Sequence, residues 1–223
     1  MNISTFNINK FQGPYGNPCE KGGYYNPRNI DFKTPIKNLC SRYLENEDDI
    51  IFVQEFYDDN KVRTKEYFEK NGYEVFHNLD KILKSHVVAI TLKKSLWKVI
   101  NPKETEFQNK FIEMELEEKS LKIVSFHKTD EKIEGRMNKE FDKGDKDIIL
   151  GDFNNTEWIN TLHNRSSGYK DLVTNDMITY KPAQTSIDRI FINKNKYENK
   201  IIFNGVIDTY MSDHNFLTFS LNI

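Results

Sequence analysis

Polar side chains that could bind a metal ion or transfer a proton stand where apolar, strand-like runs of the sequence end. In chain order they are Asn7, Glu55, His127, Asp152 with Asn154, and Asp213 with His214. A single acidic residue at such a position is most often a turn residue. In open α/β sheets, however, ligands gather at strand ends, so polar groups from several strands can converge there. Taken together, these residues predict one chemical site.

The types of these side chains indicate a hard divalent cation. Carboxylate oxygens of Glu55, Asp152 and Asp213, together with the side-chain carbonyl of Asn7, suit Mg²⁺, with Mn²⁺ as a substitute. The sequence contains no Cys/His cluster with the spacing of a zinc site. The two histidines at strand ends could donate to a phosphate oxygen or transfer protons. Asp152 is a candidate base or orienting group for a hydrolytic water.

Short β-rich runs recur along the whole chain, and several alternate as strands with one buried face do. They cover residues 3–8, 49–54, 86–92, 111–116, 121–126, 148–151, 186–192, 200–206 and 215–223. Residues 117–120 predict a hairpin between two of these runs. Because helical patterns interleave with the strands, the sequence predicts one α/β domain over residues 1–223 with mixed sheets.

Three helical patterns and one long loop complete this prediction. Apolar residues at helical spacing over 36–44 follow a Thr34-Pro35 start signal, and a second stripe runs from Ile133 to Phe141. Thr156 could cap a third helix. The Gly- and Pro-rich residues 13–27 predict a loop, for which packing by its own tyrosines and contact with a substrate both stay open.

Composition limits the classes to which the chain can belong. Of 223 residues, 37% are hydrophobic and 13% aromatic, enough for a substantial core and too much for a wholly disordered chain. No apolar run approaches the ~20 residues of a membrane-spanning helix. The N-terminus has neither a basic flank nor an apolar signal core, so we expect a cytoplasmic protein whose two cysteines are reduced thiols.

The charge balance does not point directly to nucleic acid. There are 32 basic and 34 acidic residues, a formal net charge of −2, and an acidic metal site can offset a basic binding face elsewhere. Only six of the basic residues are arginine. Because bidentate base reading depends on arginine, contacts with nucleic acid are expected to involve the phosphate backbone rather than the bases.

Six segments that carry these residues resemble the endonuclease/exonuclease/phosphatase superfamily, which includes pancreatic deoxyribonuclease and the exonuclease III type of apurinic endonuclease. The segments read ISTFNIN, IIFVQEF, LKIVSFH, IILGDFNNT, TSIDRIFIN and MSDHNFLTFSL. They follow the order of the family and extend from residue 3 to residue 221. The resemblance implies a four-layer sandwich, in which two mixed β-sheets pack face to face and helices flank them.

The resemblance also implies a metal site. Glu55 would be the principal ligand, Asn7 would belong to the same site, and Asp213 would help to hold the metal directly or through water. One-metal and two-metal mechanisms both stay open.

The remaining site residues would act on the phosphate and the attacking water. Asp152 would orient or deprotonate the water, and Asn154 would hold the scissile phosphate. His214 would stabilise developing charge or shuttle a proton, with its tautomer fixed by Asp188. His127 would donate a second hydrogen bond to the phosphate. Fixed donors and a divalent cation are what phosphodiester hydrolysis needs, since negative charge develops on the phosphoryl oxygens and the leaving alkoxide.

Departures from the patterns of individual branches narrow the choice among the branches of the superfamily. Apurinic endonucleases usually read NING or NVNG where this chain reads Asn7-Ile-Asn9-Lys10, and they tend to carry a tyrosine in place of His127. The WCDR signature of the inositol phosphatases is absent. We see neither the apolar membrane-engaging hairpins of sphingomyelinases nor the disulfides of secreted deoxyribonucleases. The acidic partner that pancreatic-type enzymes give His127 stays open: Glu74 and Asp80 lie in the right region of the sequence, and neither belongs to a decisive motif.

The function that these observations favour is a nuclease acting on DNA, rather than RNA, with little sequence preference, without a membrane partner and as a monomer. The alternative is a phosphatase or phosphodiesterase for a small phosphorylated molecule or a lipid head group. A catalytically dead binding module is disfavoured because every mapped position holds a competent residue. Tyrosines could stack on unpaired bases and lysines could follow a phosphate backbone, or both could be packed and solvated surface groups: Tyr15, Tyr24, Tyr25, Lys93, Lys94 and Lys98.

Overall fold

The computed structural model describes residues 1–223 apart from 10–47, 59–63, 79–83, 93–95, 101–108 and 210–211. The predicted helix at 36–44, the loop at 13–27 and both cysteines lie outside the described residues. None of the helices in the described part of the chain combines the length and apolarity that a bilayer crossing needs.

Two six-stranded sheets form the centre of the molecule. In spatial order the first sheet holds β11 (Ile201–Ile207), β12 (Phe216–Leu221), β1 (Asn2–Asn7), β2 (Ile50–Asp58), β4 (Lys84–Leu92) and β3 (Tyr73–Phe76). The second holds β5 (Trp97–Val99), β6 (Phe111–Leu116), β7 (Leu121–His127), β8 (Ile148–Asp152), β10 (Asp188–Asn193) and β9 (Tyr169–Asp171). Both sheets are mixed, because β1–β2 and β7–β8 are parallel and the other pairs are antiparallel.

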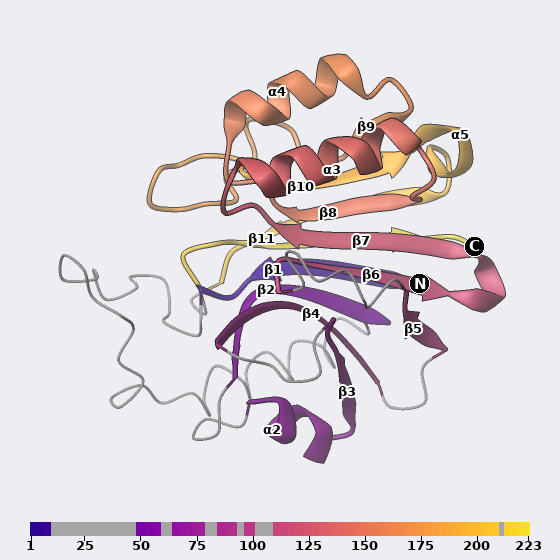
Figure 1. The fold of residues 1–223 in the computed structure, drawn as a ribbon, viewed down its shortest axis with the longest axis vertical. Coiled ribbons are helices and arrows are strands. Elements are labelled where there is room, and N and C mark those ends of the chain that lie inside the picture. Colours follow the sequence, from indigo (N-terminus) through magenta and orange to yellow (C-terminus); the bar gives the residue numbers. More distant parts are fainter. Residues whose placement is uncertain (10–47, 59–63, 79–83, 93–95, 101–108, 210–211) are drawn as a thin grey trace.

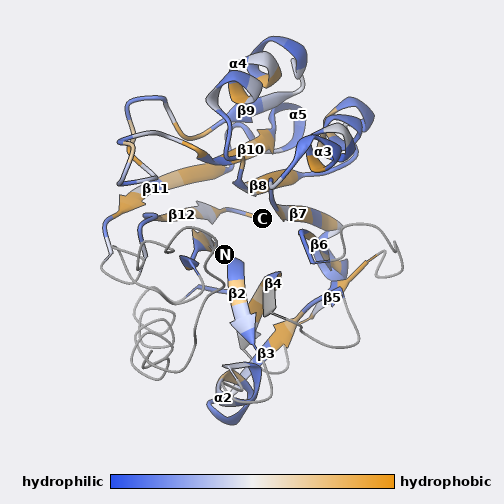
Figure 2. Cartoon of the chain, turned by 60° about the vertical axis from the view of Figure 1, so that its left-hand side comes forward, coloured by the Kyte–Doolittle hydropathy of each residue, from blue (hydrophilic) through white to orange (hydrophobic). Residues whose placement is uncertain are grey.

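The sheets pack face to face and helices cover their outer faces, which gives four layers (Figure 1). The largest apolar cluster takes residues from both sheets, including Phe52 of β2 and Leu150 of β8. α2 (Thr64–Lys70) packs through Phe68 on the outside of the first sheet. α3 (Glu131–Lys143) and α4 (Thr156–Arg165) pack on the outside of the second, and Figure 2 shows their hydrophilic turns facing outward. The predicted four-layer sandwich is confirmed.

The central strands are apolar on both faces because both faces are covered. The run from Ile50 to Val53 in β2 is fully buried, as is the run from Ile148 to Leu150 in β8. The predicted hairpin at 117–120 is confirmed, since β6 and β7 pair in antiparallel register around a turn in which Ser120 adopts a left-handed conformation.

Some elements differ from the sequence prediction. Asn155, not Thr156, caps α4, because its side chain accepts a hydrogen bond from the amide of Trp158 and Thr156 is the first helical residue. The edge strands β3, β5 and β9 were not predicted, and neither were α2 or α5 (Lys194–Tyr197). These elements are three to seven residues long, too short for a periodic pattern to stand out.

Candidate metal and phosphate site

The eight predicted site residues come from both sheets. The first sheet supplies Asn7 at the end of β1, Glu55 in β2, and Asp213 and His214 just before β12. The second supplies His127 at the end of β7, Asp152 at the end of β8, Asn154 two residues later, and Asp188 at the start of β10. Hydrogen bonds and close approaches link residues from the two sheets, so the site lies where corresponding strand ends meet.

Asn7 joins the two sheets at the centre of the site. Its side-chain amide donates to Asp152 Oδ2 at 2.8 Å and lies 3.4 Å from Glu55 Oε1. His127 Nε2 is 3.7 Å from the same Glu55 oxygen and 3.8 Å from Asp152 Oδ2. Asn154 Nδ2 lies 3.5 Å from His127 Nε2. The amide of Asn7 and the imidazole of His127 therefore converge on the same pair of carboxylates, and the amide of Asn154 lies beside the imidazole.

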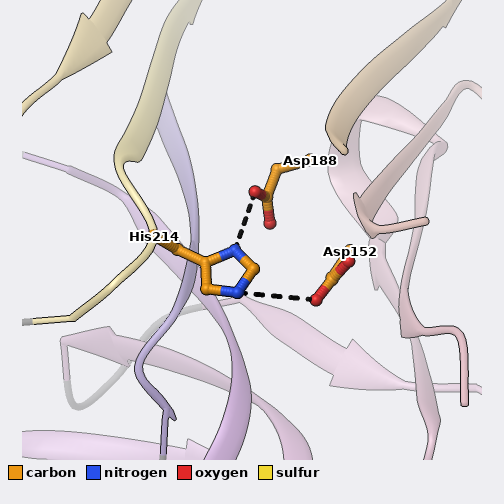
Figure 3. A group of neighbouring side chains, drawn as sticks. All are labelled: Asp152, Asp188 and His214. Atoms are coloured by element: carbon orange, nitrogen blue, oxygen red, sulfur yellow. Dashed lines mark hydrogen bonds and ion pairs between the residues drawn. The ribbon is translucent and has the colours of Figure 1, made fainter. Parts of the chain in front are cut away.

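His214 and Asp188 form a second pair beside this cluster (Figure 3). His214 Nδ1 is hydrogen-bonded to Asp188 Oδ2 at 2.9 Å, and both side chains are buried. On the other side of the ring, Nε2 lies 3.9 Å from Asp152 Oδ2 and 3.9 Å from Asp213 Oδ1. Asp188 thus fixes the orientation of the imidazole, and the opposite nitrogen faces the carboxylates.

Local backbone geometry directs two of these groups into the site. The pairing of β2 with β4 shifts between Val53 and Phe56, and within this bulge Glu55 has φ of 53°. A bulge re-aims a side chain that strict alternation would send to the other face, and left-handed backbone is uncommon for glutamate. Asn154 also has φ of 53°. Strained conformations of this kind cluster at functional sites.

Gly151 allows β8 to carry Asp152 into the site. A Cβ at this position would lie 2.1 Å from the carbonyl oxygen of Phe126 on β7, and φ of Gly151 is +135°. Below the site, Gln54 Nε2 donates to Ser125 Oγ at 2.8 Å and so links the two sheets through buried side chains. The strand ends are therefore held close by backbone contact as well as by their polar side chains.

The two histidines have opposite electrostatic environments. Burial lowers the pKa of His127 to about 4, so its imidazole is neutral near pH 7. Burial would also lower the pKa of His214, but the charges of Asp188, Asp152 and Asp213 outweigh it and raise that pKa to about 10. One ring is therefore a neutral hydrogen-bonding group, and the other is a cation next to carboxylates.

The donor set fits a divalent cation. Burial, followed by the charge of Asp188, raises the pKa of Asp152 to about 7, and burial also raises the pKa of Asp213. Asp152 Oδ1 is buried and has no hydrogen-bond partner. Ligand atoms of Asp152, Asp188 and His214 lie within 4.8 Å of one another. Buried carboxylates that repel one another and an unpartnered oxygen are what a bound cation would compensate.

Two sets of residues could hold that cation. One is Asp152, Asp188 and His214, which are buried together. Within this set, however, His214 and Asp188 bind each other, and a protonated imidazole has no lone pair for a metal. The other is the set implied by the sequence, which is centred on Glu55. We favour the second set because the first would have to break the hydrogen bond between His214 and Asp188 before it could bind a metal.

Several other residues named from the sequence lie on edge strands or outside the described residues. Glu74 lies on the edge strand β3 opposite Thr91, and among the described residues Glu55 and Asp152 have carboxylate oxygens within 4 Å of His127 Nε2. Asp80, Lys93, Lys94 and the three loop tyrosines lie outside the described residues. Lys98 pairs with Glu115 and Glu117 on the edge of the second sheet, which supports a solvated surface group.

Sequence reasoning missed three residues around the pair formed by His214. Tyr180 packs its ring against the imidazole, with centroids 4.9 Å apart, and Thr179 accepts hydrogen bonds from the amides of Ile187 and Asp188. Arg189 is 1% exposed although it is charged, and it is bonded to Asp171 and to backbone carbonyls. None of these interactions has a local sequence signal, because none of them belongs to the periodic pattern of a helix or strand.

Comparison with known proteins identifies the fold. No family model and no curated protein matches the sequence. Solved structures match over nearly all of the chain. D. rerio TDP2 complexed with a single-strand DNA product is 16% identical with a TM-score of 0.65, covering 99% of this chain and 98% of that one. An AP endonuclease from Archaeoglobus fulgidus is 13% identical with a TM-score of 0.65, covering 100% of both chains. The endonuclease/exonuclease/phosphatase from Bacteroides vulgatus is 15% identical with a TM-score of 0.59, covering 99% and 98%. The resemblance seen in the sequence is therefore confirmed at the level of the fold.

Proposed function

We propose that this chain, which has the endonuclease/exonuclease/phosphatase fold, is a divalent-metal-dependent phosphodiesterase, and specifically a nuclease that hydrolyses DNA with little sequence preference. One observation carries the proposal. A cationic His214, held by Asp188, faces a buried cluster of carboxylates and amides contributed by both sheets. Positive and neutral donors beside carboxylates are the groups that binding a phosphate together with a metal ion requires.

Glu55, Asn7 and Asp213 would hold the metal, with Mg²⁺ as the expected ion and Mn²⁺ as a substitute. The ion supplies Lewis-acid stabilisation of phosphoryl charge when it is bound. Asn7 also orients the two carboxylates on either side of it, because its amide donates to Asp152 and approaches Glu55. Divalent charge in the cluster would also lower the pKa of Asp152 and keep that carboxylate ionised.

Other residues of the chain would act on the attacking water and on the phosphate. Asp152 would accept a hydrogen bond from the attacking water and so orient it or remove its proton. His214, as an imidazolium, would stabilise negative charge on the phosphate. His127 and Asn154, adjacent to each other, would donate hydrogen bonds to phosphate oxygens. Losing one such donor typically lowers the rate by roughly 10²–10³-fold.

DNA is the preferred substrate over a small phosphorylated molecule for two reasons. The charge of Lys110 acts on His127, so a cation lies near the proposed phosphate-binding residues. Among the matching structures, TDP2 is complexed with a single-strand DNA product. A small phosphorylated molecule or lipid head group is the second candidate, and salt dependence separates the two. Backbone contacts with DNA release counterions, so cleavage of DNA should weaken steeply as salt is raised.

A Mg²⁺-dependent digestion panel tests the proposal. It compares supercoiled plasmid, single-stranded DNA, RNA, an abasic duplex and bis-p-nitrophenyl phosphate, with Asp152→Asn and His214→Ala as controls. We expect plasmid nicking that disappears with chelator and in both variants. Activity on the small diester alone would refute the nuclease assignment and retain the phosphodiesterase. No activity on any substrate would refute both.

A further inference from the structure

A four-residue segment, residues 178–181, lies between the parts of the site that come from different sheets. We call this segment the strap. His214 leads into β12 of the first sheet, whereas Asp188 begins β10 of the second. The hydrogen bond between these two side chains therefore depends on the relative placement of two sheets. The strap contacts the chain next to both residues.

On the side of Asp188, the contact is made by the hydroxyl of Thr179. This oxygen accepts hydrogen bonds from the amides of Ile187 and Asp188, each at 2.9 Å. Thr179 is fully buried, so water cannot replace the hydroxyl without a rearrangement. The strap also pairs with Thr185, whose carbonyl accepts from the amides of Thr179 and Tyr180. The backbone that enters β10 is thus fixed to the strap.

On the side of His214, the strap uses its backbone. The carbonyl of Thr179 accepts from the amide of Asn215 at 2.7 Å, and the amide of Lys181 donates to the carbonyl of Asp213 at 2.9 Å. Tyr180 then lies against the imidazole of His214, with ring centroids 4.9 Å apart. One residue, Thr179, therefore bonds to the chain beside each member of the histidine–aspartate pair.

Lys181 provides a second anchor. Its ammonium donates to the carbonyls of Ser212, at 3.1 Å, and Thr209, and it lies 3.0 Å from Asp208 Oδ1. The ammonium thus binds backbone carbonyls of residues that precede Asp213. Its side chain is partly buried, at 23% exposure, so a substitution here removes the anchor without opening the core.

We propose that the strap positions the hydrolytic site, with Thr179 as its central positioning residue. The hydroxyl of Thr179 places Asp188, its carbonyl places the segment of His214, and Lys181 places the turn before Asp213. The kinetic part of this inference rests on the proposed phosphodiesterase function. Loss of the Thr179 hydroxyl leaves two buried amides without an acceptor, and the backbone entering β10 must then shift to satisfy them. A misplacement of about 1 Å can lower the rate by roughly 10²-fold.

The central test compares Thr179→Val with Thr179→Ser and with a matched control, Thr64→Val. Thr64 is also fully buried, but its hydroxyl has no hydrogen-bond partner and it lies in α2 on the outside of the first sheet. We expect Thr179→Val to lower kcat by roughly 10- to 100-fold with KM within about twofold. Thr179→Ser should restore kcat, and Thr64→Val should match the parent protein.

A double-mutant cycle separates positioning from general destabilisation. If Thr179 acts through Asp188, Thr179→Val should cause no further loss of kcat in an Asp188→Asn background. Losses that multiply in the double variant would overturn the proposal, and so would a Thr179→Val enzyme with parental kcat. If Thr179→Val does not fold, the variant Lys181→Met tests the proposal in its place. It should lower kcat, whereas Lys170→Met, at an exposed ion pair on β9, should not. Parental kcat in Lys181→Met would then overturn the proposal.

A spectroscopic measurement keeps the strap testable if the proposed activity fails. In metal-free protein, the Nδ1–H proton of His214 should give a downfield NMR resonance because it is bonded to Asp188, and His214→Gln assigns it. We expect Thr179→Val to shift or abolish this resonance, with Thr179→Ser and Thr64→Val leaving it in place. An inactive parent protein would refute the proposed function alone. An unchanged resonance in Thr179→Val would refute the strap.

Discussion

Replacing Gly151 with alanine should destabilise the fold and displace Asp152. A Cβ here would lie 2.1 Å from the carbonyl oxygen of Phe126 and 3.0 Å from its amide nitrogen, and φ of Gly151 is +135°. A non-glycine residue in such a backbone conformation costs roughly 1–3 kcal/mol, and forcing packed neighbours apart costs roughly 1–3 kcal/mol more. The sum, about 2–6 kcal/mol, is a large part of the roughly 5–15 kcal/mol that stabilises a typical domain.

Gly135 offers the matched control, since the same substitution should have the opposite sign there. Gly135 is exposed in α3, and a Cβ added to it would meet no atom within 4 Å. Gly135→Ala should therefore stabilise the protein by about 0.5–1 kcal/mol through helix propensity. Urea unfolding followed by fluorescence of the two tryptophans measures both variants. The reasoning fails if Gly151→Ala costs less than about 1 kcal/mol, or if both variants move the urea midpoint in the same direction.

Three further predictions concern charge and capping. In metal-free protein the free energy of unfolding should fall between about pH 7 and 10. The pKa of His214 is raised from 6.5 to about 10 in the folded protein. The protonated imidazole therefore contributes its full stabilisation below pH 6.5, and this stabilisation is lost as pH rises through 10. His214→Gln should remove most of this dependence, and a parent protein with flat stability over this range would contradict the prediction. Lys146→Met should cost roughly 3–5 kcal/mol in urea unfolding, because it removes the ammonium that lies 2.9 Å from the buried carboxylate of Glu113 and 3.3 Å from that of Glu140, which keeps its ion pairs with Arg136 and Lys143. Replacing both glutamates by glutamine in the Lys146→Met background should recover stability, and no recovery would show that packing, not charge, causes the loss. Asp130→Ala should lower stability by about 1 kcal/mol, since its side chain accepts from two backbone amides at the start of α3, and an unchanged thermal midpoint would show that the cap contributes nothing.

The sequence predicted the long central strands because burial on both faces leaves a strong apolar signal. The run at 148–151 ends one residue before β8 does, and the run at 111–116 has the bounds of β6. It also predicted that polar residues at strand ends would converge, and the structure brings Asn7 within hydrogen-bond distance of Asp152, 145 residues away. Both inferences use features that each strand carries in its own sequence.

Features that depend on register could not be predicted in this way. The alternation of buried and exposed residues along a strand does not predict that Glu55 lies in a bulge with φ of 53°, because the register shift arises from the pairing of β2 with β4. The charge of Arg189 suggested the surface, but its guanidinium is buried because Asp171 and the carbonyls of Val173 and Ser186 surround it. In both cases a distant segment determines the outcome.

The strap shows why motifs identify reacting groups more readily than the residues that hold them. His214 and Asp188 belong to segments with long apolar strands beside them, so a family pattern can be recognised there. Tyr180 forms isolated bridges with Thr185 and His214, and Thr179 precedes it outside any helix or strand, so this segment has no periodicity to detect. Yet the 2.9 Å hydrogen bond between His214 and Asp188 joins two sheets, so its geometry depends on the contacts that hold the sheets together. Residues that bond to both sides, as Thr179 does, are therefore the first places to look for losses of rate without losses of binding.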